Sequence, residues 1–401
     1  MINVGQEMHR PVPQQASNVG VDLPMTVGLD HPDLRDSVTS RPGIASLPML
    51  SSITGVGTAV AGTSYSQLDV LDAFEIADPK IRSLFLNSAI ERRYLSLPLM
   101  GADGTRVPEA QGDLLDKHKA LAVEMGARAL EACLKDAGAR LSDIRYLCCV
   151  TSTGFLTPGL SALIIDELGI DPHCHRADIV GMGCNAGLNA LNPVAAWAAA
   201  HPGELAVMIC AEACSAAYVF DSTMRTAVVN SLFGDGAAAI ALVGGSAEDS
   251  STGARGPRVL KFASYVITQA LNAMRYDWDR PQGKFSFFLD PAIPYVVGAH
   301  AEIVVDRLLA GTGLRRGDIA HWLVHSGGKK VIDAVMVNLG LTRHDLRHTT
   351  GVLRDYGNLS SGSFLFSYER LVAERVAEPG DYGVLMTMGP GSTIETALVQ
   401  W

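Results

Sequence analysis

Mostly apolar short runs alternate along the chain with longer stretches in which apolar residues recur every third or fourth position. Residues 146–152 and 205–211 are such short runs, a pattern typical of buried strands. Residues 115–137 instead have the spacing of an amphipathic helix, which Gly138 is expected to end. Buried strands that alternate with helices of this length favour α/β layering around a mostly buried sheet.

A helix, a glycine stop, an Asp-Ile turn and a strand follow one another twice in the chain. The two copies of the turn read Gly138-Ala-Arg-Leu-Ser-Asp-Ile144 and Gly313-Leu-Arg-Arg-Gly-Asp-Ile319. A predicted helix precedes each copy, and a predicted strand follows it, at 146–150 and 321–325. Matches this short also arise by chance, but the shared structural context favours two halves related by gene duplication.

Changes in composition divide the chain into three predicted segments. Residues 1–50 lack periodicity and are rich in Pro, Gly, Ser, Asp and Val, which predicts a partly disordered N-terminal extension. Regular structure is expected from about Ser66. The glycine-rich stretch 244–256 separates a first half, 51–250, from a second half, 251–401. The first ten residues lack the charged and apolar regions of a signal peptide.

Composition and charge mainly exclude classes of function. The 401 residues are 48% hydrophobic and 18% charged, and the formal net charge is −10. No block of Lys and Arg reaches five residues, so we expect neither a nucleic-acid nor an anionic-membrane partner. Seven cysteines without CxxC spacing exclude a disulfide framework and a zinc ribbon. The apolar stretch 186–200 is too short to span a bilayer, so we expect a cytoplasmic protein.

Cys184 is the candidate nucleophile. It lies in Gly183-Cys-Asn-Ala-Gly187, immediately before an Ala- and Leu-rich predicted helix. Glycines on both sides permit a tight turn, and free amides at a helix N-terminus stabilise a thiolate and lower the pKa of the thiol. The alternative is a small buried core cysteine, which is the interpretation for the remaining cysteines in apolar surroundings, Cys133, Cys148, Cys149 and Cys210.

His325 and Asn358 are the candidate partners of that thiol. His325 ends a predicted strand and precedes two glycines, so its ring is expected to project into a cleft; the alternative is a satisfied core histidine. Asn358 follows Gly357 just before a predicted helix at 360–377, and alone it is typical of a helix N-cap or a turn. The chain's last strand ends in Gly389-Pro390-Gly391, which alone predicts a rigid scaffold turn.

Together these residues resemble the Cys-His-Asn triad of the thiolase superfamily, and more specifically that of chalcone synthase-like type III polyketide synthases. The matching motifs occur in family order: Gly183-Cys-Asn-Ala-Gly187, Leu232-Phe-Gly-Asp-Gly-Ala237, Trp322-x-x-His325-x-Gly-Gly328 with Asp333, Gly357-Asn358-x-Ser360-Ser361, and Gly389-Pro-Gly391 with Thr393-Ile-Glu-Thr396. They extend from about Ser66 to Trp401. The resemblance implies an α/β, thiolase-like five-layered αβαβα fold built from two duplicated halves, and a homodimer.

The chemistry that the resemblance implies fits each residue type. Cys184 would attack an acyl-CoA and carry the growing chain as a thioester. His325 would keep the thiolate charged, and would then donate a hydrogen bond, together with Asn358, to the thioester oxygen of malonyl-CoA. Loss of CO2 builds an enolate on that oxygen, and two donors stabilise it. CoA thioesters are substrates, and neither a metal nor another cofactor is expected.

Further positions correspond by resemblance to the cavity and the CoA site. Phe233 and Phe287 match two gatekeeper phenylalanines, although core packing explains either ring as well. The cavity positions are Thr157, which corresponds to a methionine that reaches across the dimer, Cys214, Ala217 and Trp278, where an indole replaces a glycine and would shrink the cavity. The basic residues expected to bind CoA phosphates are Lys80, Arg82, Arg92 and Arg93, with a solvated helix face as the alternative.

A closer resemblance concerns the product. Residues 112–119, 151–159 and 276–279 are similar to family members that make 3,5-dihydroxyphenylacetyl-CoA, an antibiotic precursor. This implies that four malonyl-CoA are condensed, followed by C8–C3 aldol closure and dehydration. The alternatives are a 3-oxoacyl-acyl-carrier-protein synthase of the initiating kind, a type III synthase with another starter or product, a catalytically silent partner subunit, and a cysteine hydrolase. A downstream dehydratase or thioesterase-type enzyme would be a partner.

Overall fold

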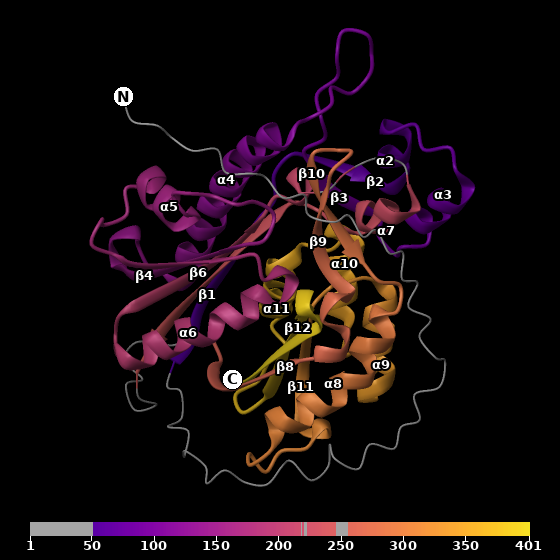
Figure 1. The fold of residues 1–401 in the computed structure, drawn as a ribbon. Coiled ribbons are helices and arrows are strands. Elements are labelled where there is room, and N and C mark those ends of the chain that lie inside the picture. The colour runs from indigo at the N-terminus through magenta and orange to yellow at the C-terminus, as the bar shows by residue number, and fades with distance from the viewer. Residues whose placement is uncertain (1–50, 218, 220–222, 246–255) are drawn as a thin grey trace, which may run out of the picture. The chain divides into compact units, whose positions relative to one another are not determined.

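Nine strands of the described residues form one sheet, in which the two halves of the chain meet edge to edge (Figure 1). This computed structural model describes residues 51–217, 219, 223–245 and 256–401. The strand order is β5-β4-β6-β7-β1-β8-β13-β12-β11. The strands are β1 (Ser51–Ala59), β4 (Ile144–Thr151), β5 (His175–Val180), β6 (Leu205–Glu212), β7 (Gly236–Gly244), β8 (Arg258–Val266), β11 (Ile319–Val324), β12 (Tyr382–Gly389) and β13 (Thr393–Gln400).

The two halves repeat one strand pattern. In the first, β4 pairs with β6 in parallel, while β6 with β7 and β7 with β1 are antiparallel. In the second, β11 pairs with β12 in parallel, while β12 with β13 and β13 with β8 are antiparallel. The predicted Asp-Ile turns precede the equivalent strands β4 and β11. In each turn the aspartate accepts a backbone hydrogen bond three residues back, Asp143 from Arg140 at 2.9 Å and Asp318 from Arg315 at 2.7 Å. The duplicated fold is therefore confirmed.

Helices complete five layers around the two half-sheets, as predicted. Three hydrophobic clusters fill the spaces between the layers: one lies under the outer helices of the first half, one around the central helices, and one under the outer helices of the second half. These helices are α4 (Gln111–Ala137), α5 (Leu160–Leu168), the central pair α6 (Ala186–Ala200) and α11 (Ser363–Glu374), and the outer pair α8 (Ile293–Leu309) and α9 (Lys329–Leu339). Each fully buried Leu or Ile side chain contributes roughly 1.5–3 kcal/mol.

Shorter elements gather at one end of the sheet in Figure 1, where loops from both halves meet. Three of them, α2, α3 and α7, have a cluster of their own around Val70, Leu71 and Phe85. The elements are β2 (Thr63–Ser66), α2 (Gln67–Ala73), α3 (Pro79–Leu86), β3 (Arg92–Leu95), α7 (Met224–Leu232), the hairpin β9 (Met274–Asp279) and β10 (Lys284–Leu289), and α10 (Arg347–Tyr356).

The structure corrects one predicted boundary near the start of the first half. Regular structure is already present at Ser51, with β1, and not only from about Ser66. This strand was missed because Ser, Thr and Gly weaken its hydrophobic pattern. Gly57 is required there, because a Cβ at this position would lie 2.2 Å from the Cys133 backbone nitrogen of α4. Residues 1–50 lie outside the described residues.

The predicted helix at 360–377 is shorter and begins differently. A 3-10 turn, η7 (Ser360–Gly362), comes first, and α11 then ends at Glu374. The boundary stretch 244–256 lies mostly outside the described residues, between β7 and β8. Both halves nevertheless belong to one compact unit that ends at Trp401, so they are not separate bodies. Within the described residues, none of the helices has the length and apolarity needed to cross a membrane.

Candidate active site

Cys184 lies in a tightly packed turn between β5 and α6. The 3-10 turn η2 (Gly183–Asn185) holds it, and the side chain is buried. Gly183 has φ +77°, and a Cβ there would lie 2.2 Å from Pro390 Cδ. A Cβ at Gly389 would lie 3.0 Å from the backbone nitrogen of Cys184. Gly389 and Pro390 of the predicted scaffold turn therefore pack directly against the nucleophile turn, whereas a Cβ at Gly391 would lie near Thr393 and Leu271.

Asn358 contacts Cys184 from the second half of the chain. The Asn358 and Ser360 side chains are within hydrogen-bonding reach of the Cys184 thiol. Asn358 Oδ1 accepts a hydrogen bond from the Ser360 backbone N–H at 2.8 Å. Since the amide oxygen is engaged, the amide NH2 is the end left to donate to a substrate. Gly357, at φ +74°, permits the reversal of the chain that brings Asn358 here.

His325 follows β11 and is joined to the Asn358 loop. Its backbone N–H donates to Met386 O at 2.8 Å, and Ser326 Oγ donates to Gly357 O at 3.2 Å. The ring is buried, with 2% of the residue exposed, and Nδ1 has no hydrogen-bond partner among the described residues. The structure thus brings the Cys184, His325 and Asn358 loops together at the end of the sheet where the two halves meet.

Burial decides the charge state of the resting site. It raises the pKa of the Cys184 thiol to about 12, and the nearby Glu212 charge acts in the same direction. It lowers the pKa of His325 to about 3. These directions run against the expectation that the helix N-terminus lowers the pKa of Cys184 and that His325 holds a thiolate, and that expectation stays a prediction. Desolvation outweighs the hydrogen bonds to the thiol, which favours a neutral thiol and a neutral imidazole in the resting site.

Two aromatic rings belong to the same hydrophobic cluster as Cys184. Phe233 and Phe287 meet edge-on with ring centroids 6.0 Å apart, and both are buried. They share a hydrophobic cluster with Cys184 and Cys214. Tyr276 of β9 adds a third ring, 5.1 Å from Phe287. This placement fits the gate that the family resemblance implies, although the gating role stays a prediction.

The remaining cavity positions differ in exposure. Cys214 is buried, and Ala217 packs against the same cluster as Cys184. Trp278 is half-exposed on β9, where it meets Phe285 edge-on at 5.1 Å. Thr157 is exposed in the loop between β4 and α5, as a residue that reaches a second subunit would be. Their roles in the cavity stay predictions.

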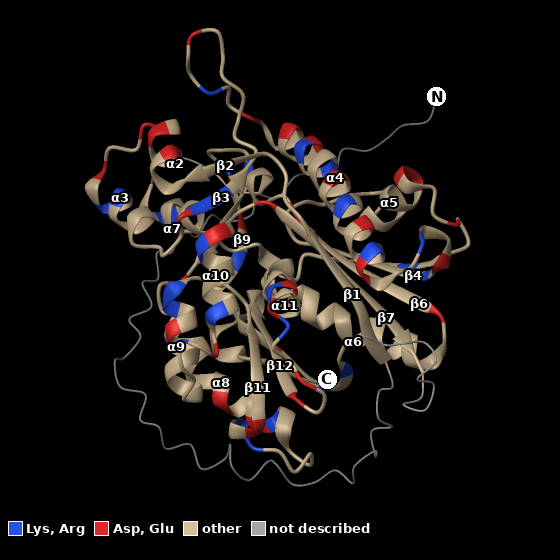
Figure 2. Ribbon diagram, turned by 180° about the vertical axis from the view of Figure 1, so that it is seen from behind, with Lys and Arg blue, Asp and Glu red and all other residues tan. Residues whose placement is uncertain are grey.

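The structure separates the four predicted CoA-binding cations. Figure 2 shows basic residues on α3 and β3. Lys80 and Arg92 are exposed, and Arg82 donates to Ile76 O at 3.0 Å. Arg93 is only 1% exposed and donates to Phe233 O at 2.6 Å and to Gln67 Oε1 at 2.9 Å. Because its guanidinium is buried and engaged, Arg93 cannot bind a CoA phosphate, and that prediction is wrong.

Arg93 belongs instead to a buried group around the Phe233 backbone. Asp235 accepts hydrogen bonds from the Ser215 and Ser96 backbone N–H groups at 2.7 and 3.0 Å. Burial raises the pKa of Asp235 to about 6 and lowers the pKa of Arg93 to about 9, while the charge of Asp235 opposes the shift at Arg93. Arg93 and Asp235 thus flank Phe233 and Gly234. The motif Leu232–Ala237 contains Asp235, but nothing in the sequence pointed to its proximity to Arg93.

Sequence reasoning also missed Glu212, a fully buried carboxylate at the end of β6. It accepts hydrogen bonds from the Ser152 backbone N–H at 2.9 Å and from Ser361 Oγ at 2.5 Å. Ser361 follows the Ser360 that contacts Cys184. The sequence signal was that this carboxylate directly follows the apolar strand predicted to end at Ala211. A buried carboxylate is unfavourable unless it is hydrogen-bonded, so its partners could have been sought.

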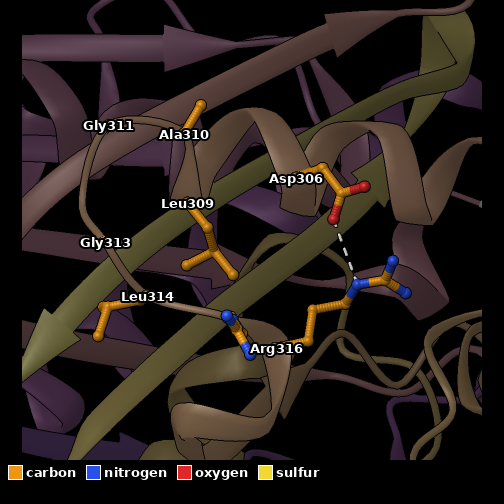
Figure 3. A pocket seen from close by; sticks show the side chains of 8 residues that line it. Asp306, Leu309, Ala310, Gly311, Gly313, Leu314 and Arg316 are labelled. Atoms are coloured by element: carbon orange, nitrogen blue, oxygen red, sulfur yellow. Dashed lines mark ion pairs between the residues drawn. The ribbon is translucent and has the colours of Figure 1, made fainter.

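A surface pocket of about 550 Å³ lies elsewhere, between the end of α8 and β11 (Figure 3). Leu309, Gly311 and Gly313 line it, and Asp306 Oδ1 pairs with Arg316 Nε at 3.2 Å. None of the predicted site residues lines this pocket. It is therefore separate from the turn that holds Cys184.

Comparison with known proteins places this geometry in a family. Residues 64–247 match the model of the N-terminal domain of chalcone and stilbene synthases, and residues 281–401 match that of the C-terminal domain. The chain is 73% identical over 390 residues to the 3,5-dihydroxyphenylacetyl-CoA synthase of Streptomyces toyocaensis, covering 96% of this chain and 100% of that one. It is 32% identical to the 1,3,6,8-tetrahydroxynaphthalene synthase of Streptomyces peucetius subsp. caesius, covering 88% and 93%.

Solved structures agree with this assignment. PKS-I from the brown alga Ectocarpus siliculosus superposes with a TM-score of 0.81 at 26% identity, covering 88% of this chain and 98% of that one. The 1,3,6,8-tetrahydroxynaphthalene synthase of Streptomyces coelicolor A3(2), a bacterial type III polyketide synthase, superposes at 0.76 with 28% identity, covering 87% and 99%. The chain therefore belongs to the chalcone and stilbene synthase family of type III polyketide synthases.

Proposed function

We propose that this chain is a 3,5-dihydroxyphenylacetyl-CoA synthase that condenses four malonyl-CoA. The observation that carries the proposal is the 73% identity to a synthase of that name over 96% of this chain. The contact between Cys184 and Asn358 supports it, because it places an amide donor beside the nucleophile. Each condensation transfers an acyl group from Cys184 to a carbon that malonyl-CoA supplies, so the enzyme is a malonyl-CoA-dependent acyltransferase.

Loading begins from the neutral pair. As the Cys184 sulfur attacks the thioester carbonyl of an acyl-CoA, neutral His325 accepts the thiol proton. The C–S bond to CoA breaks, and the CoA thiolate takes that proton as it leaves. Burial keeps the thiol protonated until a substrate arrives, which limits side reactions of a free thiolate. The acyl chain then remains on Cys184 as a thioester.

Decarboxylation uses the same two partners as donors. The thioester oxygen of malonyl-CoA accepts one N–H from His325 and one from the Asn358 amide. When the bond to CO2 breaks, its electron pair forms an enolate whose negative charge lies on that oxygen. The buried rings of Phe233 and Phe287 exclude water around the carboxylate, which favours release of neutral CO2. The enolate carbon then attacks the acyl group on Cys184.

The tetraketide closes when C8 attacks the C3 carbonyl, and loss of water makes the ring aromatic. A type III synthase with another starter or product would share every residue described so far, so the analysis of products is decisive. The initiating 3-oxoacyl-acyl-carrier-protein synthase shares Cys-His-Asn but differs in its donor, a carrier protein. None of the described residues specifically favours this carrier-protein-dependent synthase.

Further features belong to the proposal. We infer a homodimer, because the edge strand β5 ends the sheet and Phe155, close to Thr157, is 75% exposed. Lys80, Arg82 and Arg92 are the proposed cations for CoA phosphates. The absence of a cofactor, the cytoplasmic location and any downstream dehydratase or thioesterase-type partner stay predictions.

One incubation tests the function. Purified protein is incubated with malonyl-CoA alone, and the products are separated and identified by mass spectrometry. An aromatic eight-carbon CoA ester is expected, and it should be absent with Cys184→Ala. Strict dependence on an acyl-carrier protein, or a non-aromatic lactone as the main product, would overturn the proposal.

A further inference from the structure

His118, a buried histidine outside the triad, contacts the loop that follows β4. His118 of α4 is fully buried, and its Nδ1 lies 3.2 Å from Thr153 Oγ1. Its Nε2 has no hydrogen-bond partner among the described residues. The ring is pressed against Gly154, where a Cβ would lie 2.1 Å from His118 Cδ2. The contact joins residues 112–119 to residues 151–159, two segments that the sequence had singled out and the mechanism above does not use.

The groups around Thr153 favour one tautomer of this histidine. Thr153 Oγ1 accepts from the Ala213 backbone N–H at 2.9 Å, and its hydroxyl is within hydrogen-bonding reach of the Glu212 carboxylate. A hydroxyl has one proton and two acceptor positions. With the proton given to Glu212, Thr153 receives its second hydrogen bond from His118 only if Nδ1 carries the hydrogen. The order His118 Nδ1–H to Thr153 O–H to Glu212 satisfies every one of these groups.

Glu212 connects these hydrogen bonds to the turn that contains Ser360 and Ser361. Besides Thr153, it accepts from the Ser152 backbone N–H at 2.9 Å, from Ser361 Oγ at 2.5 Å and from the Ser361 backbone N–H at 3.4 Å. Burial raises the pKa of Glu212, and the hydrogen bonds that all these partners donate oppose that shift and stabilise the ionised carboxylate. The hydrogen bonds from Ser361 to Glu212 stabilise the turn that contains Ser360, which has φ +50°. In this turn the Ser360 backbone N–H donates to Asn358 Oδ1. A non-glycine residue keeps such a φ only where its surroundings hold it.

We propose that His118 is a positioning residue for the decarboxylation step. By donating to Thr153 it directs the Thr153 hydroxyl toward Glu212, and Glu212 in turn fixes the Ser360–Ser361 turn that orients the Asn358 amide. His118 touches neither the substrate nor Cys184 in this scheme. The inference rests on the proposed role of Asn358.

Two substitutions at His118 separate hydrogen bonding from space filling. His118→Asn is smaller than histidine but returns an N–H donor near the Nδ1 position, whereas His118→Leu fills more of the space and donates nothing. If His118 only fills space, Leu is tolerated better than Asn. If it positions Thr153, Asn keeps most of the activity and Leu loses it.

The assay is release of CO2 from malonyl-CoA by the full-length protein, with kcat and KM measured separately. We expect His118→Leu to lower kcat by about 10–100-fold with little change in KM, because a displaced donor weakens the transition state without weakening CoA binding. His118→Asn should remain within about threefold of the wild type. The proposal would be overturned if kcat stayed unchanged in both variants and only KM rose, more in His118→Leu than in His118→Asn.

Thr153 keeps the test valid if His118 variants fold poorly. Thr153→Val matches threonine in shape but lacks the hydroxyl, and Thr153→Ser keeps it. We expect Val to lower kcat as His118→Leu does, Ser to preserve it, and the His118→Leu/Thr153→Val double variant to lose no more than either single one. Additive losses would contradict a shared route. Wild-type protein that releases CO2 but makes no aromatic CoA ester would refute the proposed product and leave this comparison intact.

Discussion

Phe233 and Asn358 are joined through their backbones, although 124 residues of chain separate their positions in the sequence. The Gly234 N–H donates to Asn358 O at 3.0 Å, and the Asn358 N–H donates to Leu232 O at 2.8 Å. One residue belongs to the first half of the chain and the other to the second. The backbones of Phe233 and Asn358 are thus fixed to each other by main-chain hydrogen bonds, which side-chain substitutions at either position leave in place.

Asn358→Asp should lose decarboxylation while it keeps the fold. The carboxylate can still accept the hydrogen bond from the Ser360 N–H, but it has no N–H to donate and its charge opposes the enolate. We expect kcat for CO2 release from malonyl-CoA to fall by about 10²–10³-fold, and by less in Asn358→Ala, which removes the donor without adding charge. An Asp variant as active as Ala would show that no negative charge develops near this side chain.

The thiol of Cys184 should react faster as pH rises. Burial raises its pKa to about 12, so the thiolate is scarce near neutral pH and its fraction grows tenfold with each pH unit. Alkylation of the Cys184 peptide by iodoacetamide, followed by mass spectrometry, should therefore accelerate about tenfold per unit between about pH 7 and 10. The Cys184→Ala protein shows the background from the other thiols. A rate that levels off near neutral pH would mean that His325 holds a thiolate after all.

The five-layered fold was predictable because its signals are local and occur twice. The helix at 115–137, the strands around 146–152 and 205–211 and the repeated Asp-Ile turns each have a clear period or a capping residue. The strand β1 was not predictable in this way. Its Gly55 and Gly57 look like loop residues, and their purpose appears only when α4 packs against them.

The triad loops could be found from their motifs, but their electrostatics could not. A glycine-flanked cysteine before a helix predicts a low pKa, whereas the pKa also depends on how completely both halves of the chain cover the thiol. The same limit explains Arg93. Its position beside Arg92 suggests a surface pair, yet alternate residues of β3 face opposite sides, and Arg93 points inward to Phe233 O.

The exposed cations at the α3 and β3 end should contribute to CoA binding. Lys80→Ala and Arg92→Ala are each expected to raise KM for malonyl-CoA about three- to tenfold with kcat unchanged, because a phosphate contact stabilises bound substrate and transition state equally. The effect should shrink as salt is added. Lys135→Ala removes an exposed lysine from the end of α4 and serves as the matched control. A KM equal to that of this control would remove these residues from the CoA site.

Gly389→Ala should damage the nucleophile turn more than it damages the fold. The backbone at Gly389 is extended, so alanine causes no strain in φ, but its Cβ would lie 2.3 Å from Asn185 Oδ1 and 2.6 Å from the Asn185 backbone nitrogen. Relief of this overlap must displace η2 and Cys184. We expect the free energy of unfolding in urea to fall by about 1–3 kcal/mol.

Activity should suffer out of proportion to that loss of stability. A shift of the sulfur by even a fraction of an ångström relative to Asn358 is expected to cost up to about 100-fold in the rate of chain elongation. Gly112→Ala is the control, because a Cβ there meets no atom within 4 Å. If Gly389→Ala elongates malonyl-CoA as fast as Gly112→Ala, the turn tolerates displacement, and Gly389 does not position Cys184.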